Sequence, residues 1–148
     1  RDEVMSGQDS WWLRSLHYFG DRTIGDEIAS AHTDKSGFTL HLHESDPGLE
    51  FLDISTREWS PAPVMDTETV IFPGMQTQLK SGGVVKALCH RVVATEKTAK
   101  TGRFSVVCFI PLPKTARYNK NAAGRLQERK PGFNYDVTAE EFGSLFIV

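Results

Sequence analysis

The sequence predicts a mainly β protein built around a closed or sandwiched antiparallel sheet. Short runs of apolar and β-branched residues recur along the chain, and turns containing glycine and proline separate them. One run, residues 38–43, alternates apolar and polar side chains as a half-buried strand does. The chain has no internal repeat, and its 148 residues are enough for one hydrophobic core but few for two. A single domain over residues 1–148 is therefore expected.

The first half of the chain supplies three predicted strands. Residues 11–18 form an apolar run that ends at the turn Gly20-Asp21-Arg22. The turn Asp46-Pro47-Gly48 leads into a strand over residues 49–54. Between them lies the alternating run 38–43, in which the face expected to be buried carries three apolar side chains: Phe38, Leu40 and Leu42.

The second half continues in the same way. Residues 67–72 and 84–94 are predicted strands, and the turn Ser81-Gly82-Gly83 separates them. The polar residues 95–102 are expected to form a hairpin loop that leads into a last strand over residues 103–111.

The composition changes after Pro113. Basic residues accumulate over residues 114–130, where Glu128 is the single acid, and a solvated helix or loop is favoured there over a patch for an anionic partner. Thr138-Ala139-Glu140-Glu141 has the form of a capping box and predicts a short C-terminal helix. The apolar side chains of that helix are expected to pack on the β core: Phe142, Leu145 and Phe146.

The overall composition excludes some classes of function. With a net charge of −2, the chain gives no general reason to expect nucleic acid as a partner. No apolar run approaches the roughly twenty residues that a membrane-spanning helix needs, and no signal peptide is visible. Cys89 and Cys108 lie in apolar runs and form no Cys-x-x-Cys pair, which favours two reduced thiols in a cytoplasmic protein.

One pattern of residues points to metal chemistry. His32 and Asp34 are two positions apart, so a strand would direct both side chains to the same face. A second histidine, His90, begins the sequence His-Arg-Val far down the chain. Two neutral imidazoles and one carboxylate are the ligands of non-haem Fe(II) oxygenases, which leave coordination positions open. The expected metal ligands are therefore His32, Asp34 and His90.

A second pattern follows the second histidine. Arg103 and Ser105 alternate with Phe104, so both are expected on one face of a strand. The planar guanidinium of an arginine is suited to gripping a carboxylate. An anionic ligand near the metal is therefore expected at this strand.

These motifs and their order resemble those of the isopenicillin N synthase-like branch of the Fe(II)/2-oxoglutarate-dependent dioxygenases. The resemblance covers about residues 13–113, a motif-bearing β core, and residues 114–148 would form a C-terminal extension. The family usually carries a helical N-terminal portion before this core, which is largely absent from the present sequence. Further segments similar to the family lie between the motifs: Pro47-Gly48-Leu49-Glu50-Phe51, Trp59-Ser60-Pro61-Ala62-Pro63 and Val70 to Gly83.

The resemblance implies a fold and an activity. The fold would be a double-stranded β-helix, or jelly roll, with a short C-terminal helix. The protein would bind Fe(II), 2-oxoglutarate and O2, and would hydroxylate, desaturate or cyclise a small organic molecule. Arg103 and Ser105 would hold the distal carboxylate of 2-oxoglutarate. Tyr18 matches a tyrosine that assists them in the family, although Leu16 stands where plant members often have asparagine.

Other interpretations stay open. Members of the same family include Fe(II) oxidases that do not use 2-oxoglutarate, and an incomplete barrel without catalysis would serve as a binding module. His41 and His43 also have the spacing of a cupin metal site, but Glu44 and Gly48 follow too soon for that pattern. His43 is expected to line the pocket instead. The substrate and the oligomeric state are not fixed by the sequence.

Overall fold

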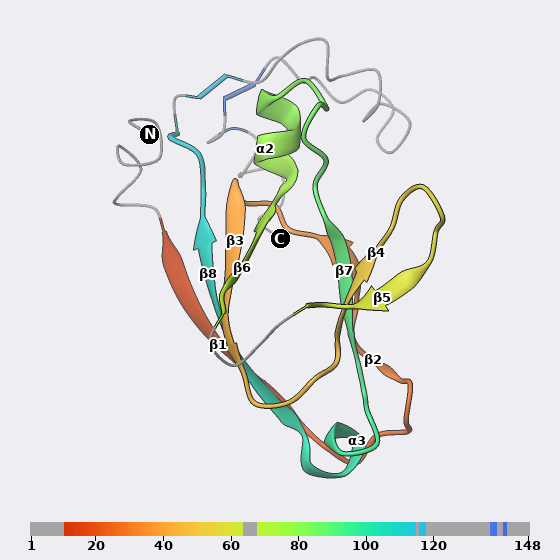
Figure 1. The fold of residues 1–148 in the computed structure, drawn as a ribbon. Coiled ribbons are helices and arrows are strands. Elements are labelled where there is room, and N and C mark those ends of the chain that lie inside the picture. Colours follow the sequence, from red (N-terminus) through yellow and green to blue (C-terminus); the bar gives the residue numbers. More distant parts are fainter. Residues whose placement is uncertain (1–10, 64–67, 115, 118–136, 139–140, 142–148) are drawn as a thin grey trace.

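The computed structural model describes residues 11–63, 68–114, 116–117, 137–138 and 141, and it contains two four-stranded antiparallel sheets that face each other (Figure 1). The strand orders are β1-β8-β3-β6 in one sheet and β2-β7-β4-β5 in the other. The strands are β1 (Trp12–Tyr18), β2 (Glu27–Thr33), β3 (Phe38–Glu44), β4 (Leu49–Leu52), β5 (Trp59–Pro61), β6 (Val70–Pro73), β7 (Cys89–Val93) and β8 (Arg103–Ile110).

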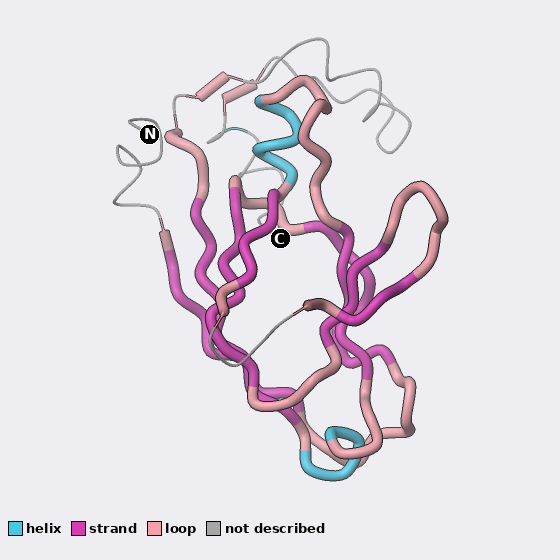
Figure 2. Tube along the Cα trace, viewed as in Figure 1, coloured by secondary structure: helices cyan, strands magenta, loops and turns pink. Residues whose placement is uncertain are grey.

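The path of the chain confirms the predicted jelly roll. The chain passes repeatedly from one sheet to the other, so β1, β3, β6 and β8 belong to one layer and the remaining strands to the second. Both sheets contribute buried apolar side chains to the core, among them Leu49, Phe72, Val92 and Val107. Strands and loops make up most of the described trace in Figure 2, and the two short helices α2 (Met75–Lys80) and α3 (Thr98–Thr101) lie at opposite ends of the molecule.

The buried face of β3 differs from the prediction. Thr39 and His41 are 1% and 3% exposed, whereas Leu42 is 39% exposed. The apolar side chains therefore do not form the covered face of this strand. Thr39 and His41 instead line the cavity between the two sheets, so both polar side chains are covered.

The strand predicted over residues 84–94 is also shorter than expected. Only Cys89–Val93 forms β7, and Val84 is 84% exposed. Gly82 and Gly83 adopt positive φ angles of 65° and 80°, so the preceding segment is a turn that does not yet enter the sheet. The hairpin loop predicted over residues 95–102 contains α3.

The C-terminal prediction is confirmed only at its first residues. The Thr138 N–H donates to Glu141 Oε2 at 2.6 Å, and the Glu141 N–H donates to Thr138 Oγ1 at 3.2 Å, which is the reciprocal pair of a capping box. The apolar residues Phe142, Leu145 and Phe146 lie outside the described residues. Among the described segments, no helix is long and apolar enough to cross a membrane.

Candidate metal and co-substrate site

The three predicted metal ligands lie together. His32 on β2 and His90 on β7 are direct partners across the two strands, and Asp34 follows the end of β2. The Nε2 atoms of His32 and His90 are 3.6 and 3.9 Å from Asp34 Oδ1, and the ligand atoms of all three residues lie within 4.8 Å of one another. Side chains that are far apart in the sequence thus converge because β2 pairs with β7.

Backbone carbonyl groups orient both imidazoles. His32 Nδ1 is 2.6 Å from the Ser30 carbonyl oxygen, and His90 Nδ1 is 3.3 Å from the Leu88 carbonyl oxygen. A proton on each Nδ1 satisfies these carbonyls and leaves the Nε2 lone pairs directed toward Asp34. Both histidines are therefore held in the tautomer that binds a metal through Nε2.

A threonine orients the carboxylate. The Thr39 hydroxyl donates to Asp34 Oδ2 at 2.5 Å, which leaves Oδ1 as the oxygen nearest the two imidazoles. The backbone of the same loop is fixed by the Met75 N–H, which donates to the Asp34 carbonyl oxygen at 2.8 Å. Sequence reasoning missed Thr39, although its position on the strand that follows Asp34 was a usable signal.

The exposure of the three ligands suits an open metal site. Asp34 and His90 are 8% and 7% exposed, while the His32 side chain is 48% exposed. Burial lowers the pKa of His90, and the neighbouring Asp34 charge only partly opposes this, so the imidazole stays neutral. Two imidazole nitrogens and one carboxylate oxygen on one side of a site fit Fe(II) and leave its other positions open.

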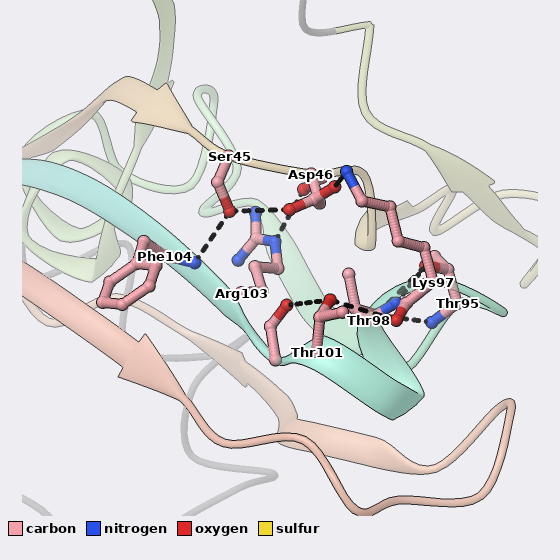
Figure 3. Close-up of polar contacts among 9 residues, drawn as sticks. Ser45, Asp46, Thr95, Lys97, Thr98, Thr101, Arg103 and Phe104 are labelled. Carbon is pink, nitrogen blue, oxygen red and sulfur yellow. Dashed lines mark hydrogen bonds and ion pairs between the residues drawn. The ribbon is translucent and has the colours of Figure 1, made fainter.

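Arg103 lies at the other end of the same cavity, and its contacts are unusual. The side chain is 1% exposed, and its Nε–H donates to the Asp46 carbonyl oxygen at 2.9 Å (Figure 3). Its Nη2 donates to the Glu44 carboxylate. Nη1 is buried without a hydrogen-bond partner among the described residues. Because an unpaired buried donor is costly, Nη1 fits a site for an anionic ligand that completes the set.

Glu44 connects Arg103 to a histidine that sequence reasoning placed wrongly. His41 Nε2 is 3.1 Å from Glu44 Oε2. Burial opposes ionisation of Glu44, but the hydrogen bonds and charges of His41 and Arg103 outweigh it, so the pKa of Glu44 is lowered. His41 lines the cavity and His43 is exposed, the reverse of the prediction, because an irregularity in the β3–β8 pairing lies between these two residues.

Tyr18 and Ser105 stand beside Arg103, as predicted. Ser105 is 1% exposed, and Tyr18 is the direct partner of Arg103 across β1 and β8. The Arg103 guanidinium carbon is 5.5 Å from the centre of the Tyr18 ring. Burial raises the pKa of the Tyr18 phenol, and the Arg103 charge and a hydrogen bond with Ser105 only partly oppose this. The phenol is therefore a neutral group that can donate a hydrogen bond.

Two cavities share part of their lining, including the metal ligands His32 and Asp34. An inner cavity of about 70 Å³ is lined by the three ligands together with Tyr18, Arg103 and Ser105. An outer pocket of about 620 Å³ is lined by His32, Asp34 and Tyr18 as well, but it extends away from Arg103. The site can therefore offer one compartment to a co-substrate and another to a substrate, with the metal ligands between them.

Fold and site together define a jelly-roll protein with a two-histidine, one-carboxylate metal centre. The chain belongs to the 2OG-Fe(II) oxygenase superfamily, whose family model matches residues 15–111. The cofactors of this family are Fe(II) and 2-oxoglutarate, and the site described above fits both.

Similar proteins are found among curated sequences and solved structures. The 2-oxoglutarate-dependent dioxygenase citB of Monascus ruber is 34% identical over 113 residues, which cover 73% of this chain and 33% of the relative. Clavatol oxidase of Penicillium crustosum is 31% identical over 113 residues, 73% of this chain and 32% of the relative. The chain thus spans about a third of the length of these curated relatives.

The structural similarity extends over most of the chain. The dioxygenase for auxin oxidation 1 of Arabidopsis thaliana, in complex with 2-oxoglutarate, matches with a TM-score of 0.64 and 26% identity, covering 70% of this chain and 38% of that protein. A full-length Neurospora crassa protein in complex with α-ketoglutarate matches with a TM-score of 0.73 and 22% identity, covering 97% of this chain and 45% of that protein. The second similarity concerns the fold alone.

Proposed function

We propose that the protein is an Fe(II)- and 2-oxoglutarate-dependent oxygenase that acts on a small organic molecule. The observation that carries the proposal is the inner cavity, where the His32, Asp34 and His90 cluster and the unpaired Nη1 of Arg103 face a common space. A metal would bind the three ligands at one end of that space, and a dicarboxylate would accept a hydrogen bond from Arg103 Nη1 at the other. The chain covers only part of its relatives, so the activity of the whole protein is included in the proposal.

Each polar residue of the cavity has a distinct role in this proposal. His32, Asp34 and His90 would hold the metal, which in this class activates oxygen and couples its reduction to oxidation of co-substrate and substrate. Arg103 and Ser105 would bind the distal carboxylate of 2-oxoglutarate. The neutral Tyr18 phenol would donate a hydrogen bond to the same carboxylate and help to exclude water from the inner cavity.

The direct test is an anaerobic titration of the protein with Fe(II) and then with 2-oxoglutarate. A visible charge-transfer band should develop, and succinate should form when oxygen is admitted. The Asp34→Ala variant should lose iron and turnover with little change in fold. The Arg103→Gln variant should bind iron but lose the band, whereas the exposed control Arg22→Gln should behave as the wild type.

Two results would redirect the assignment. Iron binding without a band would indicate an Fe(II) oxidase that does not use 2-oxoglutarate. Succinate production by Asp34→Ala at the wild-type rate would contradict the assigned metal site.

We also propose a cytoplasmic location and no nucleic-acid partner. Cys89 and Cys108 lie on the strands β7 and β8 and do not form a Cys-x-x-Cys pair, which supports a reducing compartment, and the net charge of −2 supports the absence of a nucleic-acid partner. The division into a core over residues 13–113 and an extension over residues 114–148 stays a prediction.

A further inference from the structure

Alternate side chains of β1 line one or both of the two cavities. Trp12, Arg14, Leu16 and Tyr18 alternate with outward-facing residues, and all four line the outer pocket. Only Leu16 and Tyr18 also line the inner cavity with Arg103. Arg14 is four residues from Tyr18, a distance of about 14 Å along a strand. The two cavities therefore have separate arginines, one for each compartment.

The wall of the outer pocket beside Arg14 is aromatic. Trp12 on β1 and Phe109 on β8 are direct strand partners, and their ring centres are 5.6 Å apart. The guanidinium carbon of Arg14 lies 5.7 Å from the centre of the Phe109 ring. A flat apolar surface and a cation are thus presented together at the same part of the pocket.

The charges around the outer pocket favour an anion. Arg14 lines this pocket and forms no ion pair with a described residue. Asp34 is the one carboxylate among the described residues that line this pocket, and its oxygens face the metal site and Thr39. The volume of about 620 Å³ falls in the range of small-molecule sites.

We propose that the outer pocket binds a planar, ring-containing carboxylate as the substrate of the oxygenase. The ring would pack on Trp12 and Phe109, and the carboxylate would pair with Arg14. Aromatic stacking and an arginine–carboxylate pair would fix the ligand at two points, so its remaining carbon atoms would face the metal ligands His32 and Asp34. This inference names the substrate class and rests on the proposed function.

Three related probes separate the contribution of the carboxylate charge to binding from that of the aromatic ring. Phenylacetate carries a ring and a charge, phenylacetamide carries the ring without the charge, and cyclohexylacetate carries the charge on a non-aromatic ring. Binding to the full chain is measured by calorimetry without oxygen, with Fe(II) and saturating 2-oxoglutarate present so that Arg103 is occupied. Phenylacetate should bind about fivefold more tightly than either of the other probes, since an exposed ion pair and an aromatic contact each contribute about that factor.

Matched variants assign each preference to a residue. Arg14→Gln should remove the preference for phenylacetate over phenylacetamide, and Arg22→Gln should keep it. Trp12→Leu should remove the preference for phenylacetate over cyclohexylacetate. The neighbouring control Trp11→Leu should keep that preference, because Trp11 is 57% exposed and does not line the pocket.

The outcome does not depend on turnover. If 2-oxoglutarate fails to bind, the oxygenase assignment fails, and the same titrations are made in the Arg103→Gln background without metal to test the pocket alone. Equal affinities for phenylacetate and phenylacetamide, a charge preference that survives in Arg14→Gln, or no binding of any probe would overturn the proposal.

Discussion

Replacing Thr39 by valine removes the hydroxyl that orients the metal-binding carboxylate while nearly preserving the shape of the side chain. The hydroxyl donates to Asp34 Oδ2 at 2.5 Å, and Thr39 is 1% exposed, so water has little access to replace it. Without this bond the carboxylate loses its fixed rotation, and Oδ1 is no longer held toward His32 and His90. The variant should therefore bind iron more weakly while keeping all three metal ligands.

The expected size of the effect follows from the position of Thr39 behind the ligand. Loss of a hydrogen bond to a metal-binding group lowers metal affinity by about 10–100-fold. The same loss leaves a buried carboxylate oxygen without its donor, which should lower the free energy of unfolding of the metal-free protein by about 1–3 kcal/mol. Both changes are large enough to measure.

Anaerobic competition of the protein with a chelator for Fe(II) gives the affinity, and urea denaturation gives the stability. Thr69→Val is the matched control, because Thr69 is exposed and lines neither cavity. If Thr39→Val bound iron within twofold of Thr69→Val, the orientation of Asp34 by Thr39 would have no role in metal binding.

Three further results are expected. Because the pKa of Glu44 is lowered in the folded protein, its ionised form stabilises the fold above the ordinary glutamate pKa. The wild type should therefore be more stable to urea than Glu44→Gln at neutral pH. This difference in stability should disappear as the pH falls through the ordinary glutamate pKa and below it. Iron affinity should decrease below about pH 6, because protons compete for the imidazole nitrogens, and a pH-independent affinity would argue against two histidine ligands. Gly74→Ala should lower the free energy of unfolding by about 1–3 kcal/mol, because a Cβ there would lie 2.3 Å from the Ser36 carbonyl oxygen. Thermal or urea denaturation measures this change. An unchanged stability would show that the loop after Asp34 shifts to accommodate the added methyl group.

The metal site was predictable because its residue types carry the signal. His32 and Asp34 are close in sequence, and only the pairing of β2 with β7 was needed to add His90. The strands β1, β4, β6 and β8 also lie within or overlap predicted apolar runs, since alternation and turn residues are local features.

What the sequence did not reveal depends on contacts between distant segments. The pairing of Arg103 with Glu44 joins residues 59 positions apart, and no local pattern indicates it. The buried face of β3 was assigned wrongly because His41, which the alternation rule assigns to solvent, lines the cavity between the two sheets. Helix α2 was missed because it has only six residues and no side-chain cap, and backbone contacts with the Asp34 loop fix its start.

The two binding functions of the inner cavity are divided between the two layers of the molecule. His32 and His90 belong to one sheet, whereas Tyr18, Arg103 and Ser105 belong to the other. A co-substrate bound both by the metal and by Arg103 would link the two sheets reversibly. Metal alone would tie only one layer, so 2-oxoglutarate should raise the melting temperature strongly with metal present and little without it. The dependence of 2-oxoglutarate binding on the metal could then be measured from melting temperatures alone.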